Sequence, residues 1–210
     1  AIENAWTRAS AAMADASSLV LASASPRRRE ILTTLGIDVE VMPTHADEES
    51  LQLTDHLSFV REAARLKLRT ALAREKLVGR FVLSADTIVC VDDERLGKPR
   101  DEDEAVEMLR RLSGRDHLVR TAVALGRGGT GELDCRFVET RVWFRALDVQ
   151  ALRRYVRRGE SLDKAGAYGV QGAAAGFVRR LDGSYSNVVG LPAAELVELL
   201  LQHGVIERWP

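Results

Sequence analysis

Cysteine and long apolar runs are scarce in this sequence of 210 residues. Its two cysteines, Cys90 and Cys135, lie in separate apolar runs without paired spacing, which argues against a disulfide framework or a zinc site and indicates buried thiols in a reducing compartment. No segment of membrane length is apolar throughout. The net charge of −1 gives no general attraction to nucleic acid or to membranes, so we expect neither partner, and any basic site must be local.

Internal repeats, heptads and low-complexity tracts are also absent, and the length suits one domain or two small lobes. Residues 1–18 are rich in Ala and Ser and lack the basic start and apolar core of a secretory signal. Arg8 is their only basic residue, so an organellar presequence is the weaker alternative. We interpret residues 1–18 as an N-terminal extension and residues 19–210 as the folded part, and we expect a cytoplasmic protein.

Apolar periodicity, glycines and prolines divide the rest of the chain into alternating elements. Strands and helices alternate in the first half and a hairpin occupies the middle, which predicts a mixed α/β sheet. The stretch 163–190 is too irregular for a helix. The expected strands are 19–22, 37–42, 81–92, 118–126 and 133–145, and the expected helices are 26–35, 57–77, 101–112, 148–158 and 193–203.

The first strand leads directly into a helix start at Ser25-Pro26, with Ser23 just ahead. The free amides and the positive dipole end of a helix N-terminus favour an anion. Arg27, Arg28 and Arg29 follow, although cations in a first turn oppose the dipole unless a negative group lies among them. The pattern predicts a polyphosphate cradle; the alternative is a capped helix followed by solvated arginines.

Acidic residues at two places suggest a metal site. Asp86 interrupts the apolar strand 81–91, and an unpaired buried carboxylate is costly, so Asp86 needs a partner. The polar neighbours Ser84 and Thr87 favour a lined cavity over an edge strand facing solvent. The acidic run 47–49 becomes a candidate ligand for Mg²⁺ or Mn²⁺ only in combination with Asp86, because such runs are usually solvated.

Two further stretches carry polar groups in constrained backbone. Lys98 lies between Gly97 and Pro99, and a turn of this kind can hold its ammonium toward a phosphate. The alternative is a solvated lysine in a turn. The spacing of the glycines is not that of a P-loop. The glycine-rich stretch 163–172 contains Lys164 and Gln171, and the glutamine amide can read a base edge that offers both a donor and an acceptor. A tight structural loop is the alternative. The four histidines show no ligand spacing.

Five of these stretches, in the same order, resemble the successive motifs of the Maf proteins. The resemblance implies cleavage of nucleoside triphosphates between the α and β phosphates, a divalent metal, a homodimer and a role in nucleotide-pool housekeeping. It also implies an α/β fold whose mixed twisted sheet forms two lobes around a deep cleft, similar to inosine triphosphate pyrophosphatases. The stretches are Ser23-Ala24-Ser25-Pro26-Arg27-Arg28, Ser84-Ala85-Asp86-Thr87, Gly97-Lys98-Pro99, 163–172 and 187–192.

The resemblance also implies roles for single residues. Asp86 matches the catalytic proton acceptor, and with Glu48 it would hold the metal. Positions associated with substrate choice match Arg27, Thr87 and Gln171. Further polar positions of the cleft match Arg28, Glu48, Lys67, Lys98 and Lys164.

These residues resemble the branch of the family that acts on dTTP and UTP. The 7-methylguanosine triphosphate branch typically has a bulky residue in place of Arg27 and no threonine after the aspartate. Two other functions stay open on the sequence: a non-catalytic nucleotide-binding regulator of cell division, and a nucleotidyl- or phosphotransferase, for which the sequence offers no acceptor pocket.

Overall fold

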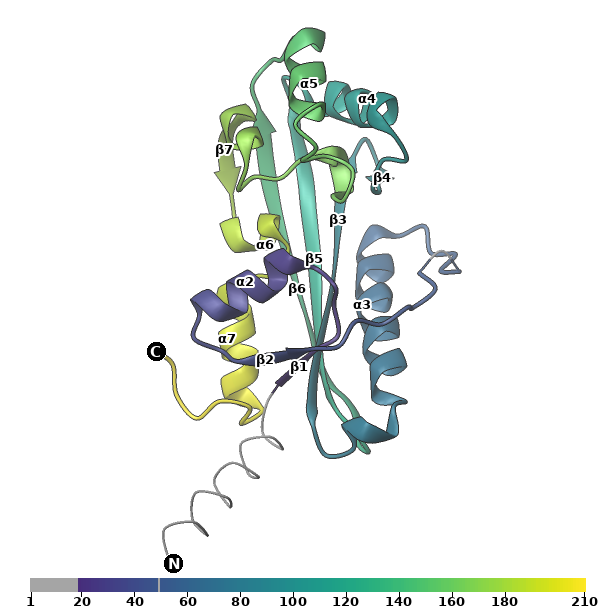
Figure 1. Cartoon of the computed structure of the whole chain (residues 1–210), viewed down its shortest axis with the longest axis vertical. Helices are drawn as coiled ribbons and strands as arrows, with labels where there is room; N and C mark the ends of the chain where they lie inside the picture. The colour runs from purple at the N-terminus through teal and green to yellow at the C-terminus, as the bar shows by residue number, and fades with distance from the viewer. Residues whose placement is uncertain (1–18, 49) are drawn as a thin grey trace, which may run out of the picture.

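The computed structural model describes residues 19–48 and 50–210, so the predicted extension 1–18 lies outside the described residues, as does Glu49 of the acidic run. A seven-stranded sheet forms the centre of the molecule, in the order β2-β1-β3-β5-β6-β7, with β4 paired to β3 (Figure 1). β1 runs parallel to β2 and β3, whereas β3, β5, β6 and β7 are successively antiparallel. The predicted mixed α/β sheet is confirmed.

The strands are β1 (Leu19–Leu21), β2 (Val39–Val41), β3 (Phe81–Val91), β4 (Glu94–Leu96), β5 (Asp116–Arg127), β6 (Gly131–Phe144) and β7 (Val178–Asp182). The α-helices are α2 (Pro26–Thr34), α3 (His56–Leu72), α4 (Glu102–Leu112), α5 (Val149–Val156), α6 (Tyr185–Val189) and α7 (Ala193–Gln202). The 3-10 helices among the described residues are η1 (Glu75–Leu77), η2 (Ala165–Ala167) and η3 (Ala173–Phe177). None of the helices in the described part of the chain is long and apolar enough to cross a membrane.

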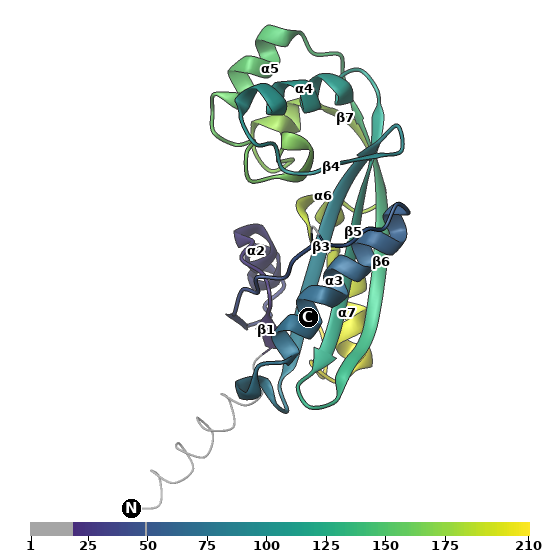
Figure 2. The same ribbon diagram turned by 90° about the vertical axis from the view of Figure 1, so that its right-hand side faces the viewer.

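Two groups of helices cover opposite ends of the long strands and create two lobes (Figures 1 and 2). At one end, α3 packs on one face of the sheet and α2 and α7 pack on the other. At the other end, α4 and α5 enclose a separate core. β3 serves all three cores, because Val82 faces α3, Leu83 faces α7 and Val91 faces α4. The predicted two-lobed arrangement is present.

Local signals place the helix starts correctly. The carboxylates of Asp101 and Asp148 accept hydrogen bonds from the amides of Glu104 and Ala151, each at 2.8 Å. Side-chain oxygens at this position satisfy amides that have no partner within the helix. The α4 and α5 helices therefore begin where the sequence predicts.

Several elements differ from the sequence prediction. The helix expected over 57–77 ends at Leu72, and the chain continues through the short turn η1. β4 was not expected, although Asp92 and Asp93 form the predicted turn, with φ of 51° and 59°. The stretch 163–190, expected to be too irregular for a helix, contains the strand β7 and the helix α6, so that expectation was wrong over Tyr185–Val189.

The unexpected helix α6 is held by contacts with distant strands. The Asn187 side chain is fully buried and donates to the Val119 carbonyl oxygen at 3.1 Å and to Thr140 Oγ1 at 2.8 Å. These partners lie on β5 and β6, far from α6 in the chain. Local periodicity does not contain this information, which explains why the sequence analysis missed the helix.

Candidate active site

One edge of β3 is open at its centre. β1 pairs with Val82 and Leu83, and β4 pairs with 89–91. Among the described residues no strand covers the edge between these two contacts, whereas β5 covers the opposite edge from end to end. Successive side chains of a strand point to opposite faces, so Asp86 and Thr87 project from the two faces beside this open edge. Both can therefore line a single cavity.

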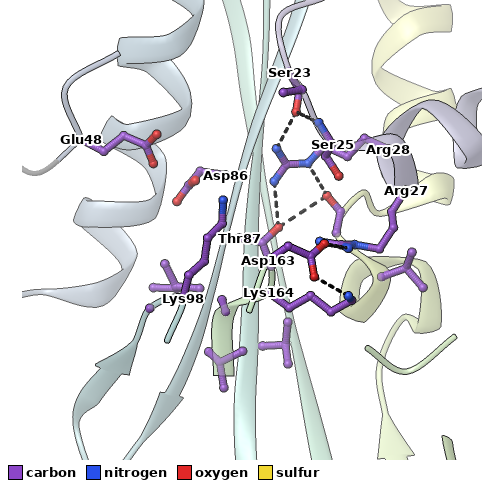
Figure 3. Close-up of a pocket in the computed structure, with 18 of the residues that line it drawn as sticks. Ser23, Ser25, Arg27, Arg28, Glu48, Asp86, Thr87, Lys98, Asp163 and Lys164 are labelled. Atoms are coloured by element: carbon purple, nitrogen blue, oxygen red, sulfur yellow. Dashed lines mark hydrogen bonds and ion pairs between the residues drawn. The ribbon is translucent and has the colours of Figure 1, made fainter. Parts of the chain in front are cut away.

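The cavity beside the open edge has a volume of about 960 Å³ and receives side chains from both lobes. This volume lies at the upper end of the range of roughly 300–1,000 Å³ found for ligand pockets. The structure brings every predicted site residue to its wall, and Figure 3 shows most of them. They are Ser23, Ser25, Arg27, Arg28, Glu48, Lys67, Asp86, Thr87, Lys98, Lys164 and Gln171.

The N-terminus of α2 opens onto the cavity without a side-chain cap. Ser25 occupies the capping position in extended backbone, with φ −69° and ψ 115°, and its hydroxyl makes no capping hydrogen bond. The first turn of α2 also has no acidic side chain. The Ser25 amide donates to Ser23 Oγ at 3.2 Å, which fixes the turn before the helix. The positive end of α2 is therefore available to an anion.

Arg28 is buried and holds three parts of the chain together. Its Nε donates to the Gly190 carbonyl oxygen at 2.9 Å, Nη1 to Ser23 Oγ at 3.0 Å and Nη2 to Thr87 Oγ1 at 3.2 Å (Figure 3). Burial lowers the pKa of Arg28 from its usual value, and the nearby Asp86 carboxylate opposes this effect. The guanidinium is engaged by hydrogen bonds within the protein, and its predicted role in neutralising phosphate stays a prediction.

Arg27, the adjacent residue, points across the cleft to the other lobe. Its Nη1 lies 2.7 Å from Oδ2 of Asp163, which precedes η2, and Oδ1 of the same carboxylate lies 2.5 Å from Lys164 Nζ (Figure 3). Burial raises the pKa of Asp163, but hydrogen bonds from Lys164 and Arg27 outweigh it and hold that pKa below its usual value. The sequence analysis gave Asp163 no role.

Lys67 on α3 joins the two predicted metal-ligating carboxylates. Its Nζ lies 2.7 Å from Asp86 Oδ1 and 2.9 Å from Glu48 Oε2. The Asp86 side chain is only 10% exposed, whereas that of Glu48 is 36% exposed. Burial raises the pKa of Glu48, the Asp86 carboxylate adds to this effect, and the Lys67 ammonium opposes it. The two carboxylates therefore favour a cation beside them, a place that the Lys67 ammonium takes in this structure.

The oxygen donors of Glu48 and Asp86 fit Mg²⁺ or Mn²⁺, which bind through one or two carboxylates together with phosphate oxygens and water. No group of three or more His, Cys, Asp or Glu side chains in the described part of the chain could hold a metal on its own. A metal at this place would depend on a phosphorylated ligand and water for its other positions.

The remaining predicted residues differ in whether their polar groups already form hydrogen bonds within the protein. Thr87 Oγ1 accepts from Arg28 and lies 3.0 Å from Thr121 Oγ1, so its hydroxyl is largely engaged within the protein. Lys98 and Gln171 are exposed, and neither side chain has a hydrogen bond or ion pair with the residues that the structure describes. Their polar groups are available to a ligand.

Arg95 and Phe59 also line the cavity, and the sequence analysis gave neither of them a role. The guanidinium of Arg95 stacks on the Phe59 ring at 3.7 Å from its centroid and donates to the Leu53 carbonyl oxygen at 2.7 Å. Both side chains line the cavity near the loop that carries Glu48. No local signal links an arginine on β4 to a phenylalanine on α3, because each fits an ordinary amphipathic pattern by itself.

A cavity with cations around a free helix N-terminus and carboxylates beside it is typical of proteins that bind nucleotide phosphates. The comparison with known protein families specifies the class of protein further. The chain belongs to the family of Maf-like proteins, whose family model matches residues 18–203.

Several named proteins are similar to this chain. The dTTP/UTP pyrophosphatase of Desulfotalea psychrophila is 47% identical over 188 residues, which cover 90% of this chain and 95% of the relative. The dTTP/UTP pyrophosphatase of Escherichia coli O157:H7 is 48% identical over 183 residues, covering 87% and 91%. Among solved structures, the Staphylococcus aureus Ham1 protein aligns with a TM-score of 0.47 at 13% identity, over 89% of this chain and 99% of that protein.

Proposed function

We propose that this protein is a nucleoside triphosphate pyrophosphatase that hydrolyses dTTP and UTP to the nucleoside monophosphate and pyrophosphate. The observation that carries the proposal is the contact of Lys67 with both Glu48 and Asp86, inside the cavity onto which α2 opens. The similarity of the chain to proteins named dTTP/UTP pyrophosphatase supports the choice of substrate.

In this proposal different residues of the cavity bind the substrate and carry out the chemical step. Ser23, Ser25 and the α2 N-terminus hold phosphate oxygens, while Arg27 and Lys98 neutralise their charge. Asp86 orients the attacking water and accepts its proton. Charge stabilisation and positioning provide most of the rate gain, as in phosphoryl transfer generally.

We propose Mg²⁺ or Mn²⁺ as the cofactor, held by Glu48 and Asp86. When bound, the metal would polarise the triphosphate by withdrawing charge from its oxygens. Removing divalent metal with a chelator is expected to abolish activity, and adding Mg²⁺ or Mn²⁺ back is expected to restore it. Full activity in the chelator would contradict this part of the proposal.

In the proposal Gln171 selects the base, and Arg27 and Thr87, which line the same cavity, contribute to the selection. Uracil and thymine share an edge with one N–H donor between two carbonyl acceptors, and a glutamine amide offers one acceptor and donors to match it. A site built from hydrogen bonds rejects other edges because its own groups are then left unpaired.

The substrate range tests the proposed function directly. The protein is incubated with Mg²⁺ and dTTP, UTP, CTP or 7-methylguanosine triphosphate, and pyrophosphate, orthophosphate and monophosphate are measured. We expect pyrophosphate from dTTP and UTP at rates at least about a hundredfold above the other two, because a site that hydrogen-bonds its substrate can reject a mismatched group by roughly 10⁴-fold. Orthophosphate as the only inorganic product would contradict the bond assignment. Preference for 7-methylguanosine triphosphate would contradict the branch, and no product at all would favour the non-catalytic regulator.

The pH dependence of turnover gives a second test, centred on Glu48. Because the pKa of Glu48 is raised in the folded protein, the ionised form needed to hold a metal is lost as pH falls through that pKa. Lys67 lowers this pKa, so Lys67→Met is expected to raise it further and to move the acidic limb of the rate–pH profile to higher pH. The matched control is Lys76→Met, which removes an exposed lysine of η1. Superimposable acidic limbs for the wild type and Lys67→Met would contradict the assignment of Glu48.

We further propose that the protein acts as a homodimer in the cytoplasm, in nucleotide-pool housekeeping and without a nucleic-acid or membrane partner. The net charge of −1 and the free thiols of Cys90 and Cys135 support the absence of such partners and a reducing compartment. The dimer follows from the family resemblance. Light scattering of the purified chain is expected to give twice the mass of one chain, and the mass of a single chain would overturn the dimer.

A further inference from the structure

Asp163 is a carboxylate placed among the cations of the cavity. It contacts Arg27 from the opposite lobe and Lys164 beside it, at 2.7 Å and 2.5 Å (Figure 3). Both cations match family positions of the cleft, and both line the cavity. One carboxylate thus occupies two cations at the place where a polyphosphate is expected.

The ion pair between Arg27 and Asp163 is weak enough for a phosphate to replace the carboxylate. The Asp163 side chain is 58% exposed and that of Arg27 is 24% exposed. Ion pairs in such solvent-exposed positions contribute at most about 1 kcal/mol, because water and salt screen them. A triphosphate carries several negative charges and can accept bidentate hydrogen bonds from an arginine, so it would displace a single carboxylate.

The exchange requires only side-chain movement. β3, β5 and β6 pass through both lobes, so the lobes share one sheet and are not joined by a flexible linker. Arg27 lies in the first turn of α2, and Asp163 lies in the loop before η2. Rotation of these two side chains is sufficient to replace a carboxylate oxygen by a phosphate oxygen.

We propose that Asp163 is an internal competitor for the phosphates of the substrate. It holds Arg27 and Lys164 in the empty cavity, yields them to the bound nucleotide, and takes them back as the products leave. Asp163 is a positioning residue that sets affinity and contributes no chemical step. This inference rests on the proposed function, because it takes the ligand to be a nucleoside triphosphate.

Binding of a non-hydrolysable analogue to Asp163→Asn tests the proposal without requiring turnover. Calorimetry with the α,β-methylene analogue of dUTP is expected to give a dissociation constant about fivefold lower than for the wild type, the scale of one exposed ion pair. The KM for dTTP should fall by a similar factor while kcat changes less than about twofold. Inhibition by pyrophosphate should strengthen in parallel, because the product meets the same freed cations.

Two controls separate competition from a general structural effect. Glu107→Gln removes an exposed carboxylate that pairs with Arg110 at 2.7 Å on α4, away from the cavity, and should leave analogue binding unchanged. In an Arg27→Gln background, Asp163→Asn should lose at least about half of its effect, because residues that interact directly are not additive. A purely structural role of Asp163 would give the same effect in both backgrounds.

If the wild type hydrolyses dTTP and Asp163→Asn binds the analogue no more tightly than the wild type, the competitor role is overturned. The proposed function then stands. Tighter binding by Asp163→Asn with no hydrolysis by the wild type supports the competitor role and overturns the pyrophosphatase instead. A wild type that does not bind the analogue overturns both.

Discussion

Asp86→Asn is expected to lower the turnover of dTTP by about a thousandfold, because a positioned general base contributes roughly 10² to 10⁴ in rate and the lost charge adds to this. The amide has nearly the shape of the carboxylate but cannot accept a proton from water. Among the residues that the structure describes, Asp86 is the only buried carboxylate, and it lies beside Lys67, so none of the other described carboxylates is placed to replace it. Binding of the α,β-methylene analogue of dUTP without metal should stay close to that of the wild type, because the proposal assigns the phosphates and the base to other residues.

Pyrophosphate release and calorimetric binding measure the two halves of this prediction. Asp92→Asn is the matched control, because Asp92 is an exposed aspartate in the turn after β3 and pairs with Arg115 away from the cavity. The control should retain full turnover. Equal turnover in Asp86→Asn would remove Asp86 from the catalytic role, and lost analogue binding would place it in substrate binding.

Arg28→Met is expected to destabilise the protein by about 3 kcal/mol, the cost found when one member of a buried charged network is removed. The change removes the guanidinium hydrogen bonds to Ser23 Oγ and to the Gly190 carbonyl oxygen, and it removes a buried positive charge that interacts with Asp86. Methionine keeps most of the volume, so the loss reflects hydrogen bonds and charge more than a cavity. Urea denaturation followed by circular dichroism measures the change in unfolding free energy.

Arg29→Met provides the comparison for Arg28 within the same helix. Arg29 is exposed, and its replacement should change stability by less than about 0.5 kcal/mol. Similar stabilities for the two variants would show that the contacts of Arg28 do not hold β1, β3 and the end of α6 together. The result also bears on activity, because a clamp that fails would misplace Thr87 as well as Arg28.

Much of the fold follows from local signals in the sequence. Pro26 begins α2 because its ring already has the helical φ and its missing N–H would have no partner there. Asp101 and Asp148 begin α4 and α5 because their carboxylates satisfy free amides. The same locality explains why Asp86 was identified, since a carboxylate within an apolar strand is visible without any knowledge of the fold.

The rest could not be predicted because it depends on distant parts of the chain. α6 forms around the buried Asn187, whose partners belong to β5 and β6. Asp163 meets Arg27 across 136 positions of sequence. Arg27 and Arg28 are chemically identical neighbours, but one step along a helix rotates a side chain by about 100°. One guanidinium therefore points across the cleft, and the other is buried among protein oxygens.

One core joins β1 and α2 to the helix α7, and this arrangement has a consequence for synthesis on the ribosome. Leu21 of β1 and Leu32 of α2 are fully buried against Leu196 and Leu199 of α7. α7 is made long after β1 and α2, so the first strand and helix must remain exposed, with apolar side chains in contact with water, until α7 has emerged. The core at the phosphate-facing end therefore cannot close before α7 is made, and a nascent chain that lacks α7 exposes apolar side chains that promote aggregation.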